Sequence, residues 1–178
     1  MTRHCSLARI DATHELAPWF RAAYADYVQG LAAFDPALYV KGEDGVWQPD
    51  HVPYWLSDPD AHTLLGLAQG RPFGFACVGS SAFPYKSPEA DHCLAEFFVS
   101  LPFRRRGLGA ALADITLRTF PGAWELSVLP GNVSALRFWR RVLAAIASSP
   151  ALETVAFHEV TFRCTVAPPA DPIFRAAM

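Results

Sequence analysis

The chain has 178 residues, of which 52% are apolar and 18% are charged, so it can bury a sizeable core and intrinsic disorder is excluded. Its formal net charge of −2 provides no general attraction for nucleic acid or for an anionic membrane. The N-terminal residues contain no uninterrupted apolar core, and no apolar run approaches the roughly 20 residues of a membrane span. We therefore expect neither a secretory signal nor a transmembrane helix.

The four cysteines, Cys5, Cys77, Cys93 and Cys164, stand far apart and form no C-x-x-C pair. This spacing favours buried free thiols over a disulfide framework or a zinc site. We therefore expect a cytoplasmic protein that holds no metal.

The predicted elements begin with an amphipathic helix over about Thr13–Leu31, in which apolar residues recur every three or four positions. A turn-rich segment, Phe34–Asp60, follows and accommodates a short helix over Val52–Leu56. Because long irregular connections inside a compact domain are often functional, this segment is a candidate for ligand binding.

Strands and helices alternate over the rest of the chain. The predicted strands are His62–Ala68, Pro72–Val78, Cys93–Ser100, Trp124–Leu129, Leu152–Phe157 and Glu159–Val166. One predicted helix runs over Gly107–Phe120, and a second begins after Asn132, whose side chain can cap it. The order βα(α)βββαβαββ predicts a single α/β (α+β) domain over residues 1–178, with a mixed sheet covered by helices and a Pro-containing C-terminal tail at 168–178.

The most informative stretch is Glu96–Ala110, where a strand is followed by three consecutive arginines and by glycines that open a helix. Gly107 and Gly109 let a ligand approach the backbone closely, and the N–H groups of a first helical turn favour phosphate. The segment has neither the Gly-Lys-Ser/Thr of a P-loop nor the three glycines of a dinucleotide fingerprint. It predicts a pyrophosphate site, with a solvated arginine cluster before an ordinary helix as the alternative.

Two motifs resemble those of the GNAT superfamily of acyl-CoA-dependent N-acyltransferases. Arg104-x-x-Gly107-x-Gly109, which follows the strand end Phe97-Phe98-Val99, looks like the superfamily's acetyl-CoA signature. Asn132-x-x-Ala135-x-x-Phe138-Trp139 resembles its second motif. With the order of the elements, the resemblance covers nearly the whole chain except the tail. It implies a mostly antiparallel central sheet flanked by helices, and N-acetyltransferase activity with acetyl-CoA as cosubstrate and no metal.

The resemblance also implies where the coenzyme binds. Backbone groups of Phe97, Phe98 and Val99 are expected to pair with the pantetheine arm, at a strand edge opened where two neighbouring strands splay. The N–H groups of the turn that follows are expected to hold the pyrophosphate, with Arg104 and Arg106 adding charge. The residues of this turn are Arg104, Arg105, Arg106, Gly107, Leu108, Gly109 and Ala110.

Three residues of the second predicted motif complete the expected coenzyme site. Asn132 either contacts the pantetheine or only caps its helix, and Phe138 packs beside the coenzyme. Arg141 either reaches the adenosine phosphates or belongs to a solvated helix face.

Acetyl transfer to an amine needs a neutral nitrogen, donors for the developing oxyanion and a proton for the leaving thiolate. A backbone N–H near Val99 can polarise the thioester carbonyl. Glu96 is the only acid in a run of apolar strand residues, where desolvation raises a carboxyl pKa, so it is the candidate base, directly or through water. The alternative is a structural carboxylate satisfied by backbone or by an arginine.

The proton donor is less well defined, because the superfamily commonly has a tyrosine where this chain has Trp139. An indole N–H donates hydrogen bonds but is not a usable acid. Other proton carriers therefore stay open: Tyr24, Tyr27, Tyr54, Tyr85, His92, His158 and solvent.

Charges are distributed unevenly along the chain. Seven arginines and two acids lie between Ser100 and Arg141, whereas seven acids and one lysine lie between Asp26 and Asp60. The basic region suits polyanionic coenzyme A; the acidic one attracts a cationic acceptor or serves solubility alone. We predict an N-acetyltransferase acting on a primary amine of a small molecule or peptide, as a monomer or homodimer. The alternative is a non-catalytic acyl-CoA-binding or sensing domain.

Overall fold

The computed structural model describes residues 5–80, 83–156 and 158–168. Its elements are β1 (Ser6–Ile10), α1 (Ala17–Ala32), β2 (Val40–Lys41), β3 (Trp47–Gln48), α2 (Val52–Ser57), β4 (Ala61–Ala68), β5 (Arg71–Ser80), β6 (His92–Val99), the 3₁₀ turn η1 (Leu101–Phe103), α3 (Leu108–Thr119), β7 (Gly122–Val128), α4 (Val133–Ile146), β8 (Leu152–Ala156) and β9 (Glu159–Val166). The predicted order is confirmed, with the small β2–β3 hairpin as an addition. Phe157 and nearly all of the predicted tail, from residue 169 onward, lie outside the described residues.

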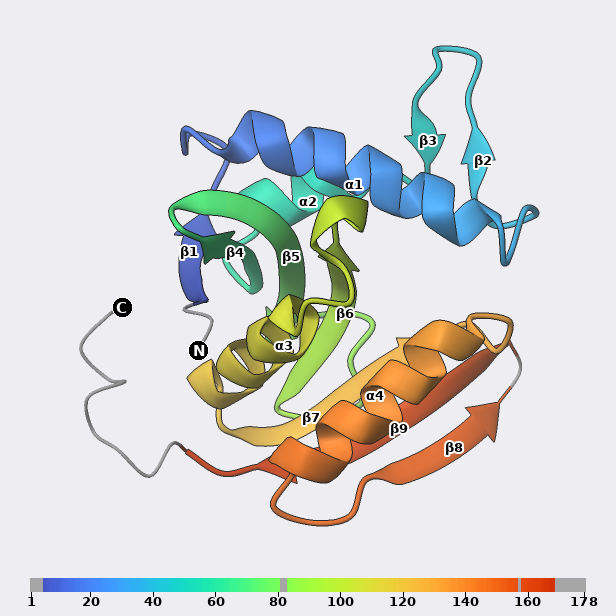
Figure 1. Ribbon diagram of the computed structural model, residues 1–178. Helices are drawn as coiled ribbons and strands as arrows, with labels where there is room; N and C mark the ends of the chain where they lie inside the picture. The colour runs from blue at the N-terminus through green and yellow to red at the C-terminus, as the bar shows by residue number, and fades with distance from the viewer. Residues whose placement is uncertain (1–4, 81–82, 157, 169–178) are drawn as a thin grey trace.

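Seven strands form one sheet in the order β1-β4-β5-β6-β7-β9-β8. All neighbouring strands run antiparallel except β6 and β7, which are parallel. Helices α1 and α2 pack on one face of the sheet, and α3 and α4 pack on the other (Figure 1). The expected mixed, mostly antiparallel sheet flanked by helices is confirmed.

Helix α1 begins later than predicted, at Ala17 rather than near Thr13. The Asp11 carboxylate accepts hydrogen bonds from the backbone N–H groups of Thr13 and His14, at 2.8 and 3.1 Å. These bonds stabilise a turn in place of a first helical turn. The helix then starts at Ala17 with Pro18 in its first turn, where the missing N–H of proline costs nothing.

The buried face of α1 also differs from the one that the apolar spacing predicts, because it includes Tyr24 and Val28. Leu31, which the spacing places on the apolar face, is only partly buried at the end of the helix. The difference brings the Tyr24 ring, with its hydroxyl, under the sheet.

Helix α4 carries the apolar stripe that its sequence predicts. Its buried residues are Leu136, Trp139, Val142, Leu143 and Ile146. Burial of each such side chain contributes roughly 1.5–3 kcal/mol, so this stripe is a major part of the contact between α4 and the sheet. Apolar spacing in α3 predicts a buried face of Leu108, Ala111, Leu112 and Ile115, which is wrong in part. Ala113, Thr116 and Leu117 are also fully buried, because α3 packs on the sheet and contacts α4.

Strand β6 contains a β-bulge. Cys77 on β5 pairs with Glu96, whereas the next residue, Val78, pairs with Leu94. Ala95 is thus the extra residue. A bulge of this kind lets two consecutive side chains face the same side of a sheet, and both Ala95 and Glu96 lie toward α1 and α2.

Among the described residues, no helix combines the length and the apolar character that crossing a membrane requires. The four cysteines are free thiols, as predicted, and all except the partly exposed Cys5 are buried.

Candidate active site

The edge of β6 that faces β7 loses its strand partner halfway along. The parallel pairing with β7 covers only His92–Leu94, whereas the pairing with β5 continues to Val99. Within the described residues, the β7-facing edge from Ala95 to Val99 is thus unpaired, and we call it the open edge. An unpaired edge offers backbone donors and acceptors to an extended molecule.

The direction of the backbone groups decides which residues serve the open edge. Successive residues of an antiparallel strand direct their N–H and C=O groups to alternate edges. The Ser100 N–H donates to Phe73 O on β5 at 2.9 Å, so the groups of Phe98 also face β5. Phe97 and Val99 therefore present the groups of the open edge, and Phe98 contributes its ring on the face of α1 and α2.

The turn between η1 and α3 has the backbone conformation that its glycines predict. Gly107 is the N-cap of α3, with φ +79° and no side-chain cap, and a Cβ built on it would meet open space. Arg105 also has a positive φ, 59°. The N–H groups of Leu108, Gly109 and Ala110 belong to the first helical turn, where they have no intrahelical acceptor and favour an anion.

The three arginines of this turn differ in their surroundings. The Arg104 Nε–H donates to the Val99 carbonyl at 2.7 Å, and its guanidinium lies 5.6 Å from the centre of the Phe98 ring. Arg104 is thus folded back onto the end of β6, next to the open edge. Arg105 and Arg106 are exposed on the turn itself.

Helix α4 brings two of its predicted residues toward this region. The Asn132 side chain accepts hydrogen bonds from Ala135 N–H at 3.1 Å and from Ser134 Oγ at 3.0 Å, so it caps the helix. The Phe138 ring stacks on Phe97 at 5.7 Å between centroids, and a Cβ on Gly109 would lie 3.5 Å from it. Phe138 therefore lies between the open edge and the start of α3. Arg141 is on the exposed side of α4.

Glu96 points to the opposite side of β6, toward α1. The Tyr24 hydroxyl donates to its Oε1 at 3.0 Å. Burial raises the pKa of Glu96 from 4.5 to about 7, although the neighbouring Tyr27 and Tyr24 hydroxyls favour the charged form. Such a carboxyl group is partly ionised near neutral pH and can accept a proton there.

Trp139 has no comparable role. It is buried in the core between the sheet and α4, with its ring 5.0 Å from those of Phe97 and Phe138. It thus lies on the side of β6 opposite to Glu96. Of the other proposed proton carriers, Tyr24 bonds to Glu96 and Tyr27 packs beside it. Tyr54 packs on Trp55 and Phe83 instead, His92 bonds to Ser80 at the far end of β6, and Tyr85 and His158 are exposed.

Two residues near this carboxylate were missed by the sequence analysis. Tyr39 follows α1, and its pKa is raised to about 12, first by burial and then by the charges of Glu96, Glu159 and Asp35. Glu159 begins β9, far from Glu96 in the sequence. Asp35 lies in the same turn as Tyr39, but Glu96 and Glu159 act on Tyr39 from β6 and β9, so no local pattern predicts their combined effect.

Many acids of the Asp26–Asp60 segment also have local structural roles. Four of them accept backbone hydrogen bonds at 2.9–3.0 Å within their own turns: Asp35, Asp44, Asp50 and Asp58. Their charges remain on this side of the molecule, but turn formation explains their positions at least as directly as attraction of a ligand does.

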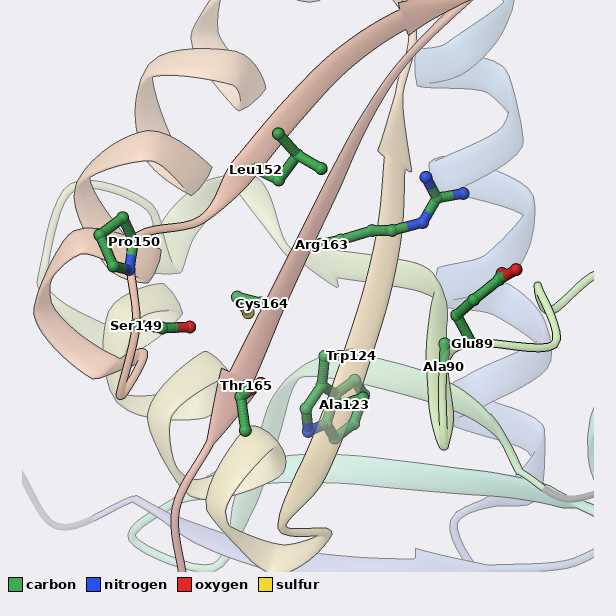
Figure 2. Close-up of a pocket in the computed structure, with 10 residues that line it drawn as sticks. All are labelled: Glu89, Ala90, Ala123, Trp124, Ser149, Pro150, Leu152, Arg163, Cys164 and Thr165. Atoms are coloured by element: carbon green, nitrogen blue, oxygen red, sulfur yellow. The ribbon is translucent and has the colours of Figure 1, made fainter.

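Two of the hollows on the described surface differ in their relation to the site. One, of about 260 Å³, lies over β7 and β9 (Figure 2). It contains none of the predicted site residues, and its Arg163 side chain pairs with Glu125 at 2.8 Å. The other, of about 220 Å³, lies between α1 and β3 and is lined by Arg21, Tyr24, Ala25, Val46, Trp47, Asp50 and Val52. The second hollow therefore reaches the tyrosine that binds Glu96.

The chain belongs to the GNAT acetyltransferases: the family described as "Acetyltransferase (GNAT) family" matches residues 15–144. No curated protein matches the sequence. Among solved structures, an acetyltransferase from Thermus thermophilus is 15% identical, with a TM-score of 0.60 over 90% of this chain and 97% of that one. The GNAT domain of S. lividans PAT is 14% identical, with a TM-score of 0.63 over 91% and 90%.

A third structure, diaminobutyrate acetyltransferase EctA from Paenibacillus lautus in complex with L-2,4-diaminobutyric acid and coenzyme A, is 14% identical. Its TM-score is 0.58, over 92% of this chain and 96% of that one. At these identities the three structures show the common fold.

Proposed function

We propose that the protein transfers the acetyl group of acetyl-CoA to a primary amine of a small molecule or peptide. The observation that carries this proposal is the position of Glu96. This desolvated carboxylate, with a pKa of about 7, lies on β6, the strand that also provides the open edge. Membership of the GNAT acetyltransferases supplies the class of reaction.

In the proposed complex, the pantetheine arm pairs with the Phe97 and Val99 backbone groups as an added strand would. The first-turn N–H groups of α3, from Leu108 to Ala110, hold the pyrophosphate, with the exposed Arg105 and Arg106 adding positive charge. Phe138 packs beside the arm. Arg104 stabilises the end of β6 through the Val99 carbonyl and acts on the coenzyme through that contact.

The chemical step follows from the same groups. The amine nitrogen attacks the thioester carbonyl carbon, whose oxygen is polarised by the Val99 backbone N–H. The nitrogen loses a proton to Glu96, directly or through water, and the C–S bond breaks to release coenzyme A thiolate. The thiolate takes a proton from solvent or from a hydroxyl other than the family's usual tyrosine, because Trp139 replaces it.

The acceptor is proposed to be cationic. After burial, the charges of Glu96, Glu159 and Asp35 raise the pKa of Tyr39, so negative charge acts on this ring, and aromatic rings with carboxylates suit an ammonium group. The apparent KM for the amine is then expected to rise with salt, since screening at 0.15 M limits exposed attraction to about 8 Å. An unchanged KM between low and high salt, or preference for anionic amines, would contradict this part of the proposal.

The test of the activity is release of free thiol from acetyl-CoA in the presence of a panel of amines. Turnover with at least one amine supports the transferase. Coenzyme binding without turnover on any amine favours the second candidate, a non-catalytic acyl-CoA-binding or sensing domain, for which the burial of Trp139 at the position of the usual acid is the specific observation.

A further inference from the structure

The carboxylate of Glu96 is surrounded by aromatic residues from one turn of α1. Tyr24 and Tyr27 are three residues apart and thus share a helix face. Both rings pack on Phe75 of β5, at 6.0 and 5.7 Å between centroids, and Tyr27 also packs on Phe98 at 6.0 Å. The two rings contact each other at 5.8 Å. Their orientation is therefore fixed by packing on the sheet.

Both hydroxyls favour the ionised form of Glu96. Tyr24 Oη donates to Oε1 at 3.0 Å, and the neighbouring Tyr27 hydroxyl also lowers the pKa of the carboxyl group. Burial, followed by the charge of Glu96, raises the pKa of each tyrosine well above its ordinary value of 10. The tyrosines therefore stay protonated and can only donate.

We infer that Tyr24 and Tyr27 are positioning residues, which hold the Glu96 carboxylate toward the acceptor and keep it ionised enough to take a proton. This role rests on the proposed function, in which Glu96 is the base. Burial alone would favour a protonated, inactive Glu96 at neutral pH. The two tyrosine hydroxyls lower the pKa of Glu96 and so oppose the effect of burial. The sheet therefore excludes water from the carboxylate, and α1 keeps part of it ionised.

The other titratable groups around Glu96 titrate at higher pH and do not overlap with its titration. Cys77 faces it from β5, Cys93 lies on the same strand, and Tyr39 approaches from the segment after α1. Burial raises the pKa of Cys77 well above 9, that of Cys93 to about 12 and that of Tyr39 to about 12. Between about pH 5 and 9, a proton taken up by this cluster belongs to Glu96.

The experiment compares Tyr24→Phe and Tyr27→Phe with a matched control, Tyr54→Phe. Tyr54 is on α2, packs on Trp55 and Phe83, and is not among the groups that shift the pKa of Glu96. In protein labelled with ¹³C at the glutamate carboxyl carbon, the Glu96 signal is assigned by its loss in Glu96→Gln. We expect either test variant to raise the pKa of that signal by about one unit, as loss of one hydrogen bond to a charged group predicts.

The same variants have a kinetic signature. Because the base is protonated over a wider range, kcat/KM at pH 6 should fall about tenfold in each test variant and stay near normal at pH 9. The KM for acetyl-CoA and the Tyr54→Phe profile should not change. The inference would be overturned if Tyr24→Phe and Tyr27→Phe both fold and the pKa of Glu96 in each equals that of the wild type. The tyrosines would then serve only to pack the core.

The two readouts separate this inference from the proposed function. If no amine supports turnover, the proposed function fails while the carboxyl titration still decides whether the tyrosines control Glu96. If turnover is normal and the titration does not move, the transferase stands and the positioning role fails. The phenylalanine variants keep the ring, and two independent positions guard against one variant that fails to fold.

Discussion

The turn before α3 and the cluster around Glu96 differ in the groups that they offer a ligand, which are backbone groups in the turn and side chains in the cluster. The turn from Arg104 to Ala110 offers mainly backbone N–H groups, and the conformation of Gly107 shapes it. The Glu96 cluster consists of side chains from α1, α2 and β6, and Tyr24 and Glu96 are 72 residues apart. A backbone site tolerates most side-chain changes except the addition of bulk at its glycines, whereas a side-chain cluster is sensitive to the loss of one charge or one donor.

The largest effect is expected at the side-chain cluster. Glu96→Gln keeps the shape but removes proton acceptance, so kcat/KM at neutral pH should fall about 10² or more if Glu96 is the base. The acidic limb of the pH profile, which lies near pH 7 in the wild type because activity is lost as Glu96 takes up a proton, should disappear. Near-normal turnover with the same limb would show that Glu96 is structural.

The matching change at the backbone site is the addition of bulk. Gly107→Val and Gly109→Val should weaken coenzyme A binding tenfold or more in calorimetry, because a side chain blocks close approach of the pyrophosphate. Gly70→Val is the control: Gly70 has φ +74° and open space around it, like Gly107, but lies in the β4–β5 turn. Unchanged affinity in both test variants would show that coenzyme A does not bind at this turn.

Stability should respond to Glu96 in the opposite direction from activity. Its pKa is raised from 4.5 to about 7 in the folded state, so the folded protein binds the proton more tightly and burial of the charge destabilises it most above pH 7. Glu96→Gln should increase the free energy of unfolding by about 1–2 kcal/mol at pH 8. Denaturant titrations should show this gain shrinking as the pH falls toward 4.5. A gain independent of pH would contradict the desolvated carboxylate.

The smallest effect is expected at Trp139, which belongs to the core more than to either site. Trp139→Tyr should keep the fold and lower the unfolding free energy by about 1 kcal/mol, because the smaller ring leaves part of the space of the indole unfilled. A phenol at this position should raise turnover modestly by supplying the proton donor common in the family. Trp139→Phe, which has no hydroxyl, should not. Equal turnover in the two variants would show that thiolate protonation is not limiting.

The difference between the two regions also explains what could be predicted from the sequence. The strand, arginine turn and glycines from Glu96 to Ala110 are contiguous, so the helix start at the glycines and the Asn132 cap follow from local pattern, whereas the open edge was expected from the resemblance to the GNAT superfamily. The exclusive use of Phe97 and Val99 at the open edge needed the register with β5.

The cluster around Glu96 could be predicted only at Glu96 itself. The spacing of apolar residues predicts the approximate range of α1 but the wrong buried face, so it does not indicate that Tyr24 is buried next to the sheet. The bulge at Ala95, the hydrogen bond from Tyr24 to Glu96 and the effect of the Glu159 charge on Tyr39 depend on tertiary contacts between distant segments. No single-sequence pattern encodes such contacts, which is why the acceptor side stays less defined than the coenzyme side.

The single parallel seam of the sheet has a mechanical consequence. The antiparallel blocks β1-β4-β5-β6 and β7-β9-β8 are joined along the backbone by three residue pairs, His92–Leu94 with Trp124–Leu126. A coenzyme seated beside this seam would be linked to both blocks and would stabilise the folded chain by about 2.7 kcal/mol at a hundred times its Kd. Amide exchange at Leu94 and Leu126 should then slow as coenzyme is added, even without an acceptor. The cosubstrate would thus also stabilise the contact between the two antiparallel blocks.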